Sequence, residues 1–350
     1  MRWNEVHIAG TGSWLPKRKR AEDAIASGQY DVDEHQANRI VSVTAADGEN
    51  DPSPPEMAVA AARVALSRSG RAREDVSALL HSRTWFQGAE MWAPASYIAH
   101  HAVGADVPAF ELLQSCNAGL AALEHAARLL GPDEAALLTT ADRFAAPAFD
   151  RWRCERGLVY GDGATALVLS SRAGFARLLS TATAVDNSME AVARGAVLDA
   201  VPDTSAPVDL SARADAFLHT PALSRQVGLR LAEIADASVR RALDDAGADM
   251  ADITRVVLNA TGRSRMRWQL ELQLGVAEKI SNWEFCSEVG HLGAGDHFAG
   301  LNDLMERRAV HPGDLVLLVG GGTGYSCTSA VVEITGSPEW ETGDGAERTS

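Results

Sequence analysis

The sequence predicts an α/β fold made of two similar halves, and the clearest evidence is an internal repeat. Residues 65–70 have the pattern of a helix end with a glycine cap and are followed by the apolar run 75–80. Residues 242–247 are followed at the same spacing by residues 252–257, and both pairs lie 177 residues apart (242 − 65 and 252 − 75). Because this offset is close to half of the 350-residue chain, we predict the same helix, short loop and buried strand in each half.

Apolar runs that are typical of strands also close both halves. Residues 161–169 and residues 315–322 are short apolar segments that carry glycines at their ends. With 46% hydrophobic residues, the chain can form one large body or two fused domains. We expect an N-terminal half over residues 1–175, a C-terminal half over residues 176–336, and a loose polar tail over residues 337–350.

Cys116 lies where an apolar run that begins at Ala109 turns directly into an amphipathic helix. The apolar residues with helical spacing are Leu120, Leu123, Ala126, Ala127 and Leu130, and the pattern stops at Gly131-Pro132. Unpaired N–H groups and the positive dipole end at a helix N-terminus favour a thiolate and can hold an oxyanion. A nucleophile there suits acyl transfer through a thioester, whereas a lone cysteine in apolar surroundings is more often a buried small side chain. The 177-residue offset places Cys116 opposite Gly293, at the start of the matching helix of the second half.

The composition is that of a cytosolic enzyme. A net charge of −15 leaves no electrostatic footprint for a nucleic-acid partner. Cys154, Cys286 and Cys327 share no metal-ligand spacing with Cys116, so we expect buried reduced thiols and no metal site. No apolar stretch reaches the length of a membrane span and residues 1–5 begin no signal peptide, which predicts a cytoplasmic protein without a membrane partner. The basic run after Pro16 is expected to be a solvated loop.

Three motifs resemble one family when they are taken in order. The Cys116 segment, Gly-Asp-Gly-Ala at residues 161–164 and Val-Gly-Gly-Gly-Thr-Gly at residues 319–324 are similar to ketoacyl synthase III enzymes of the thiolase superfamily. The resemblance runs from about residue 4 to residue 335. It implies a thiolase-like fold with two pseudo-symmetric halves in five α-β-α-β-α layers, and a homodimer. It also implies an acyl-cysteine intermediate, charged from an acyl-coenzyme A or acyl-carrier-protein donor without a resident cofactor.

The chain departs from the family pattern at the residues that serve condensation. Condensing members carry His-Gln-Ala-Asn after the strand that corresponds to residues 253–258, whereas this chain has Asn259-Ala260-Thr261-Gly262. The second family Asn is replaced by His291, and Asp296 follows five residues later. In condensing relatives the His and Asn stabilise the enolate that malonyl decarboxylation releases. Their replacement therefore favours ordinary acyl transfer to a hydroxyl, with His291 as general base and Asp296 orienting it.

Neighbouring residues offer alternatives to this assignment. His297 adjoins Asp296 but lies one turn inside the helix, where a structural histidine is the usual reading. Asp296 itself could instead complement the helix dipole from the first turn. Residues 35–38 spell His-Gln-Ala-Asn, but they occur in the N-terminal sixth of the chain, where the fold does not need the motif. We expect that segment to be a polar loop or a helix start.

This variant resembles the ketosynthase-III-like acyltransferases of antibiotic pathways, some of which malonylate a sugar and some of which load a carrier protein. The resemblance implies that Cys116 takes a short acyl group such as malonyl and passes it without decarboxylation to a hydroxylated natural product such as a glycosylated polyketide. The amides of Cys116 and Gly321 would hold the oxyanion, and Asn259 would hydrogen-bond the thioester. The alternatives are a priming condensing enzyme, an acyl-carrier-protein acyltransferase, or a non-catalytic partner subunit, for which an intact Cys116 has no use.

Donor and acceptor contacts are less well defined. Arg263, Arg265 and Arg267 cluster near the place where relatives admit the pantetheine arm, as phosphate ligands or as solvent-exposed residues. Residues 44–50 are acidic where family members commonly have an arginine-rich stretch, which leaves a carrier-protein donor open. The apolar residues Trp85, Phe86, Met91 and Trp92 are expected to pack in the core or to line an acceptor pocket.

Overall fold

The computed structural model describes residues 1–196, 198, 206–338 and 340. The elements of the first half are β1 (His7–Trp14), β2 (Arg18–Arg20), α1 (Ala21–Ala26), α2 (Val32–Asn38), β3 (Ser42–Thr44), α3 (Pro54–Ser69), β4 (Val76–Ser82), α4 (Pro94–Ala102), β5 (Ala109–Glu111), α5 (Ala118–Leu129), β6 (Ala135–Asp142) and β7 (Gly163–Ser170). The elements of the second half are β8 (Ala176–Val185), α6 (Ala191–Arg194), α7 (Leu210–Phe217), α8 (Pro221–Ala246), β9 (Ile253–Leu258), α9 (Arg263–Arg267), a π-helix (Trp268–Leu274), α10 (Trp283–Val289), α11 (Asp296–Glu306), β10 (Leu315–Gly322) and β11 (Ser326–Ile334).

Apart from the edge strand β5, the large sheet has the same arrangement on either side of its middle. Its strand order is β5-β4-β6-β7-β1-β8-β11-β10-β9 across the described residues. Outward from β1 and from β8, each half has one antiparallel neighbour followed by a parallel pair, β6 with β4 and β10 with β9. The halves join where β1 meets β8 through only two residue pairs, His7 with Arg177 and Ile8 with Ala176. The sheet therefore consists of two similar parts with a narrow connection.

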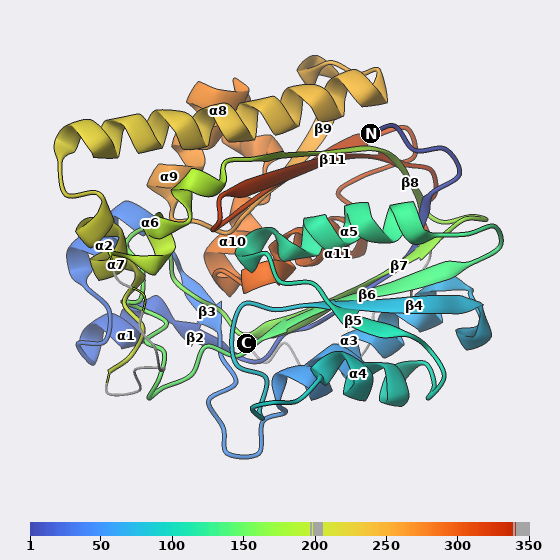
Figure 1. Ribbon diagram of the computed structural model, residues 1–350, viewed down its shortest axis with the longest axis horizontal. Coiled ribbons are helices and arrows are strands. Elements are labelled where there is room, and N and C mark those ends of the chain that lie inside the picture. Colours follow the sequence, from blue (N-terminus) through green and yellow to red (C-terminus); the bar gives the residue numbers. More distant parts are fainter. Residues whose placement is uncertain (197, 199–205, 339, 341–350) are drawn as a thin grey trace.

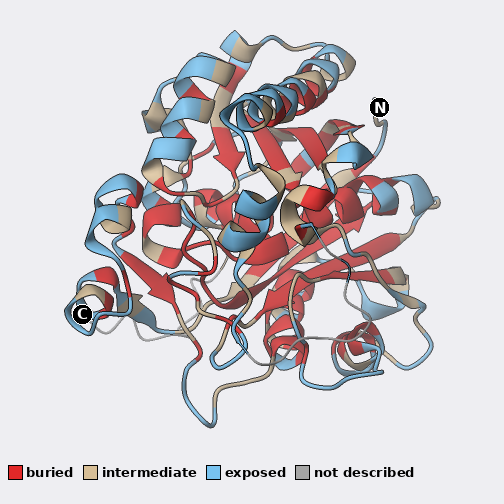
Figure 2. Ribbon diagram, turned by 60° about the vertical axis from the view of Figure 1, so that its left-hand side comes forward, coloured by how far each residue is buried: buried red, intermediate tan, exposed pale blue. Residues whose placement is uncertain are grey.

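The helices complete five layers, which confirms the predicted fold class (Figure 1). Helix α8 covers the outer face of the second-half strands, α3 and α4 cover the outer face of the first-half strands, and α5 and α11 lie between the two strand layers. Strands β6 and β7 are buried along their whole length, as expected for strands with helices on both faces. In Figure 2 the strands and the inner helices are mostly buried, while the outer helices have an exposed side.

The predicted repeat is present at the level of single residues. Gly70 and Gly247 end helices α3 and α8 with left-handed φ angles of 64° and 69°. The short helical turns that follow, Arg73–Asp75 and Met250–Asp252, begin 177 residues apart (250 − 73), as do β4 and β9 (253 − 76). In each turn the aspartate side chain accepts a hydrogen bond from the backbone N–H three residues earlier. The same local chemistry thus leads the chain from helix to strand in both halves.

Three details differ from the sequence-based expectations. The apolar run at residues 161–169 forms β7 and closes the first half as expected, but the run at residues 315–322 forms β10 and does not close the second half, because β11 follows it. The turn before α11 is shifted by one further residue, so Gly293 corresponds to Ser115 and not to Cys116. The basic residues after Pro16 do not form a loop, because residues 18–20 pair with β3 as the short strand β2.

The C-terminal segment begins on the body of the protein. Trp340 packs edge-on against Phe175, with 5.1 Å between ring centroids, and the Arg68 guanidinium lies 4.7 Å from its ring. Residues 339 and 341–350 of the predicted polar tail lie outside the described residues. Over the described ranges, no helix combines the length and the apolar character that crossing a membrane would require.

Candidate active site

The turn that carries Cys116 is held between the two halves. Ser115 has a left-handed φ of 48°, a 3-10 turn spans Ser115–Asn117, and α5 follows directly. The buried Asn117 side chain donates to Ser326 Oγ (3.1 Å) and Thr328 Oγ1 (2.9 Å) on β11 and accepts from the Thr328 N–H (3.1 Å). These three hydrogen bonds fix the nucleophile turn of the first half on a strand of the second half.

The matching turn of the second half carries the candidate base. Gly293 has a left-handed φ of 61°, a 3-10 turn spans Gly293–Gly295, and α11 begins at Asp296. The two turns lie against each other, because a Cβ at Gly119 in α5 would collide with the carbonyl oxygen of Ala294. Helix starts from both halves therefore meet at one place between the strand layers.

Cys116, His291 and Asp296 form a continuous hydrogen-bonded chain at this place. His291 Nε2 lies 2.9 Å from Cys116 Sγ, and His291 Nδ1 lies 2.6 Å from Asp296 Oδ2. Asp296 also accepts from the backbone N–H groups of Ala260 and Leu292, both at 2.8 Å. The aspartate thus fixes which nitrogen of His291 faces the sulfur. The sequence suggested His291 as a base toward the acceptor only, whereas the 2.9 Å contact places it on the thiol as well.

The charges in this chain support one another. Burial alone would lower the pKa of His291, but the Asp296 carboxylate and the Cys116 sulfur outweigh it and hold this pKa well above its ordinary value. Burial would likewise raise the pKa of Asp296, and the His291 imidazole instead keeps that pKa below its ordinary value. The site therefore favours the protonated form of His291, which lies between the Asp296 carboxylate and the Cys116 sulfur.

Asn259 contacts Gly321 in a way that changes the predicted oxyanion site. The Gly321 N–H, expected to be a free donor, donates instead to Asn259 Oδ1 at 2.8 Å. The physical reason is that an Asn side chain in this position presents an acceptor oxygen to the amide. Its Nδ2 is buried and has no hydrogen-bond partner among the described residues. The site thus contains an unpaired amide donor on Asn259 in addition to the backbone of the Cys116 turn.

His297 binds the backbone of β10. Its Nε2 donates to the carbonyl oxygen of Val319 at 2.9 Å, and its ring lies beneath Gly320. Burial lowers the pKa of His297, so this histidine is neutral at pH 7. Its contacts are those of a structural residue that supports β10.

The His-Gln-Ala-Asn string at residues 35–38 lies within α2 and not beside the sulfur. Asn38 is buried and donates to Tyr30 Oη at 3.0 Å. It packs so closely on Gly262 that a Cβ there would collide with Asn38 Oδ1. His35 lines a cavity of about 220 Å³, together with Arg20, Glu22, Arg39, Ile40 and Val41. The segment therefore borders the loop that follows Asn259.

The three candidate donor-binding arginines do not converge on one point. Each forms an ion pair with its own carboxylate: Arg263 with Glu278, Arg265 with Glu155, and Arg267 with Glu271. Their side chains are about half exposed. Because every charge is already compensated locally, the cluster is not a ready phosphate site.

A second cavity of about 220 Å³ lies beside the nucleophile turn. Its lining residues are Arg83, Thr84, Leu113, Gln114, Ser115 and Thr323. Five of these six side chains are polar, so the cavity suits a short polar group better than an alkyl chain. Of the aromatic group nearby, Phe86, Met91 and Trp92 are exposed, which corrects the expectation that they pack in the core.

The remaining thiols are placed as the sequence suggested. Cys154, Cys286 and Cys327 are buried and free, and burial raises the pKa of Cys154 and of Cys327 to about 12. Burial also holds the pKa of Cys286 well above its ordinary value. Cys116 is the partly exposed cysteine of the four.

Tyr160 is a residue of the site that the sequence did not predict. Its ring meets the His291 ring edge-on at 5.1 Å, and its hydroxyl donates to Glu155 at 2.9 Å. Burial first, and then the Glu155 charge, raise its pKa well above the ordinary value. Its position directly before Gly161-Asp162-Gly163 was the available signal, but only the fold reveals the contact with His291.

Comparison with known proteins gives the family. Residues 243–334 match the C-terminal model of 3-oxoacyl-[acyl-carrier-protein (ACP)] synthase III. The mycobacterial beta-ketoacyl-[acyl-carrier-protein] synthase III of Mycobacterium tuberculosis H37Rv is 26% identical, covering 94% of this chain and 96% of its own length. The acetoacetyl CoA synthase NphT7 of Streptomyces sp. CL190 is 26% identical, covering 93% and 98%.

Solved structures agree with this result. The acyltransferase ChlB3 superposes with a TM-score of 0.88 at 36% identity, covering 96% of this chain and 99% of its own. The 3-oxoacyl-[acyl-carrier-protein] synthase III of Aquifex aeolicus superposes with a TM-score of 0.77 at 18% identity, covering 94% and 99%, and shares the fold. On this evidence, the chain belongs to the thiolase-like ketoacyl synthase III family and is an acyltransferase.

Proposed function

We propose that this enzyme moves a short acyl group such as malonyl from a thioester to a hydroxyl of a natural product without decarboxylation. The observation that carries the proposal is the hydrogen-bonded chain from Cys116 through His291 to Asp296. A thiol, a base and an orienting carboxylate in this order serve nucleophilic acyl transfer. We place the activity in antibiotic biosynthesis, with the sugar of a glycosylated polyketide as the acceptor.

The reaction proceeds in two balanced steps. In the first, the Cys116 thiolate attacks the thioester carbonyl, the carbon–sulfur bond of the donor breaks, and His291 gives its proton to the departing thiolate. In the second, the acceptor hydroxyl attacks the acyl-cysteine and loses its proton to the now neutral His291. The bond between the acyl carbon and Cys116 Sγ then breaks as the ester forms. Cys116 is again a thiolate and His291 is again protonated, so the enzyme returns to its starting state.

Acylation prepares His291 for its second role. The charge on Cys116 contributes to the raised pKa of His291 in the free enzyme. An acyl-cysteine carries no charge, so that contribution disappears while Asp296 remains. We expect the pKa of His291 to fall on acylation, so that more of the imidazole is neutral near pH 7 and able to take the proton of the acceptor hydroxyl.

Asn259 and the Cys116 backbone N–H hold the oxyanion of both steps. The Gly321 N–H binds Asn259 Oδ1, which orients the side-chain amide and leaves Nδ2 as the unpaired donor. A buried donor without a partner is costly unless a bound group accepts from it. The thioester carbonyl oxygen provides that acceptor.

Condensation is disfavoured by the same residues. An enolate must be stabilised where its charge develops, and the neutral amide of Asn259 cannot supply the cationic or proton-shuttling help of an imidazole. The only imidazole in contact with Cys116 among the described residues is His291, which is already engaged with Asp296. A malonyl group thus keeps its carboxylate during transfer.

The cavities support a choice of substrate. The polar cavity beside Ser115 and Thr323 accommodates the short acyl group. The cavity beside α2 is lined by Arg39, which suits a phosphate of coenzyme A or of a carrier protein's phosphopantetheine arm, whereas Arg20 is already paired with Glu22 of the same lining. The reaction needs no resident cofactor, because the donor thioester supplies the activated acyl group.

We further propose a homodimer joined through the free edge of the sheet. Strand β5 ends the sheet order and leaves one backbone edge unpaired within the described chain. Phe110 and Leu113 are more than half exposed there, and Phe86, Met91 and Trp92 add exposed apolar surface from the preceding loop. An unpaired strand edge with exposed apolar residues is a surface that a second copy can cover.

The function is tested by intact-protein mass after mixing with a panel of acyl thioesters. The wild type should gain the mass of one acyl group, and the added mass identifies the preferred acyl unit. Cys116→Ala should gain nothing, because the other three thiols are buried and protonated. Equal labelling of both proteins, or labelling that maps to Cys154, would reject Cys116 as the nucleophile.

A further inference from the structure

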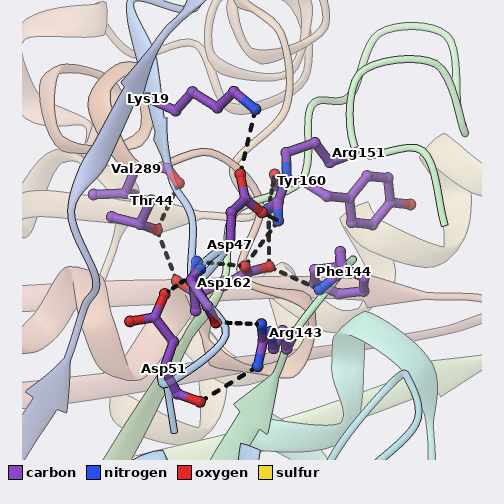
Figure 3. A network of polar contacts seen from close by, with 12 residues as sticks. Lys19, Thr44, Asp47, Asp51, Arg143, Phe144, Arg151, Tyr160, Asp162 and Val289 are labelled. Carbon is purple, nitrogen blue, oxygen red and sulfur yellow. Dashed lines mark hydrogen bonds and ion pairs between the residues drawn. The ribbon is translucent and has the colours of Figure 1, made fainter. Parts of the chain in front are cut away.

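A network of ion pairs and hydrogen bonds surrounds the buried pair Arg151 and Asp162 (Figure 3). Asp162 is fully buried and accepts from Arg151 Nη1 (2.9 Å), Arg151 Nη2 (2.8 Å) and the N–H groups of Ala46 (2.8 Å) and Phe144 (2.7 Å). Arg151 also pairs with Asp47 at 3.0 Å, and Asp47 pairs with Lys19 at 3.3 Å. Two loops far apart in sequence, the one after β3 and the one between β6 and β7, thus meet at one guanidinium.

The network is joined directly to the backbone of the candidate base. The N–H of His291 donates to the carbonyl oxygen of Val159 at 2.8 Å, and its carbonyl oxygen accepts from the Gly161 N–H at 2.9 Å. Thr44 Oγ1 adds a bridge, donating to the Asp162 carbonyl oxygen at 2.7 Å with the Val289 carbonyl at 3.1 Å. The position of His291 along this segment therefore depends on where residues 159–162 are held.

Close approach leaves this segment little freedom of its own. A Cβ at Gly161 would collide with the Val289 carbonyl oxygen, and Gly290 adopts a left-handed φ of 75° before His291. The carbonyl of Tyr160 accepts from Arg151 Nη1 at 3.4 Å. A change in the Arg151–Asp162 pair is thus transmitted through backbone hydrogen bonds to the His291 ring.

We propose that Arg151, with Asp162, is the positioning residue that sets the distance between His291 and the Cys116 sulfur. This inference rests on the proposed function for its role in catalysis, but the geometry it concerns can be measured without any acyl transfer. Arginine is suited to the role because its planar fork binds both Asp162 oxygens at once, whereas the lysine ammonium is a single point of charge. Removing it would leave the Asp162 carboxylate buried without its counter-ion.

The test compares Arg151→Met, Arg151→Lys and Asp47→Asn with the wild type. Asp47→Asn is the matched control, because it weakens the outer contact of Arg151 and leaves the buried Asp162 pair intact. The first readout is the rate of Cys116 alkylation by iodoacetamide against pH, with the modified residue identified by mass spectrometry. The second is single-turnover transfer from preloaded acyl-enzyme, and the third is the melting temperature.

Alkylation against pH reports the thiolate–imidazolium pair rather than overall stability. The titratable groups that face this pair are Asp296 and His297 of α11, Tyr160, and Tyr325 before β11. None of them is altered in the variants. A change in the alkylation profile therefore reports a displaced His291.

We expect Arg151→Met to lose about 100-fold in transfer, the loss typical of a misplacement of about 1 Å. Its alkylation profile should shift to higher pH, because His291 no longer stabilises the thiolate. Arg151→Lys should lose less, and Asp47→Asn should stay within about threefold of the wild type. Ile98→Ala, which opens a cavity in the distant helix α4, should lower the melting temperature without moving either kinetic readout.

Several results would overturn the proposal. Folded Arg151 variants with wild-type alkylation and transfer would do so. So would an Ile98→Ala protein that has the same melting temperature as Arg151→Met and loses as much activity in both kinetic readouts. If Arg151→Met does not fold, Thr44→Val provides the answer, since it removes only the hydroxyl bridge and should slow transfer severalfold. If wild type alkylates but never forms an acyl-enzyme, the proposed function fails while the alkylation comparison still decides the positioning role.

Discussion

The two turns that meet at the candidate site have the same backbone and opposite environments. In the first half, Ser115 begins the 3-10 turn that contains Cys116 and takes a left-handed φ of 48°. In the second half, Gly293 begins the 3-10 turn that leads to Asp296 and takes a φ of 61°. Cys116 is partly exposed, whereas Asp296 is 2% exposed.

This difference shows how a repeated framework acquires one active site. Both turns begin an inner helix, and both present backbone N–H groups at the same interface. The partly exposed turn of the first half carries Cys116, which must meet the substrate. The buried turn of the second half leads to Asp296, whose charge orients His291. His291 lies between them and contacts one residue from each turn.

The largest expected effect comes from removing the link between the turns. His291→Ala should slow both loading of Cys116 and transfer to the acceptor, since the ring contacts the sulfur and serves as the base. General-base loss typically costs about 10²–10⁴-fold. His297→Asn is the matched control, because His297 binds only the Val319 carbonyl, and it should retain most activity. Single-turnover kinetics of both steps make the comparison, and a dead His297→Asn with an active His291→Ala would reverse the assignment.

A smaller loss is expected when the buried turn keeps its shape but loses its charge. Asp296→Asn retains one carbonyl oxygen for three donors, from His291, Leu292 and Ala260. The imidazole should then lose its fixed orientation, and transfer should fall by less than in His291→Ala. One unsatisfied buried donor should also cost about 1–3 kcal/mol of stability. Transfer at the wild-type rate in Asp296→Asn would mean that Asp296 serves only the helix.

The pH dependence separates the free enzyme from the acyl-enzyme. A raised pKa keeps His291 protonated in the free enzyme, and acylation lowers that pKa by removing the Cys116 charge. The rate of transfer from isolated acyl-enzyme should therefore rise with pH to a plateau. The midpoint of this rise should lie at a lower pH than the midpoint of His291 titration in the free enzyme. The free-enzyme midpoint comes from NMR of the imidazole. A midpoint for transfer that is equal to or above the free-enzyme midpoint would contradict the proposed fall in the pKa of His291 on acylation.

The smallest expected effect concerns the backbone of the two turns. Gly293→Ala would put an alanine at a left-handed φ of 61°. Its Cβ would lie 2.5 Å from Asp142 Oδ2 and 2.7 Å from Thr84 Oγ1. We expect a loss of about 1–3 kcal/mol in the free energy of unfolding. Ser115→Gly at the corresponding position should change stability by no more than about 1 kcal/mol, because glycine accepts that φ freely. Denaturant titration of both variants compares the turns, and equal losses would show that their strain is alike.

The framework was predictable because its signals are local. Gly70 and Gly247 end their helices as the glycine caps predicted, and the apolar runs after them form β4 and β9. The one-residue shift before α11 was missed because the offset was extended from β9 across loops whose lengths differ between the halves. The closing strand of the second half, β11, was not foreseen, since apolar runs alone do not show which strand is the last in a sheet.

The site was predictable in its members and less so in their contacts. Sequence reasoning named Cys116, His291 and Asp296 through a resemblance, and the structure brings them together. It did not foresee that Asn259 binds the Gly321 N–H, because that contact joins segments 62 residues apart. The roles of Tyr160 and Arg151 likewise arise from packing between distant loops. Exposure of the aromatic loop was also hidden, since apolar residues look the same in a core and at an interface.

The most direct test of the central claim follows the free carboxylate of malonyl during turnover. Malonyl thioester labelled at that carbon is incubated with enzyme and acceptor, and released carbon dioxide and product are both counted. We expect the label to remain in an alkali-labile ester, because Asn259 and Gly262 replace the residues that would stabilise an enolate. Stoichiometric release of labelled carbon dioxide alongside product would contradict this account and identify a condensing enzyme.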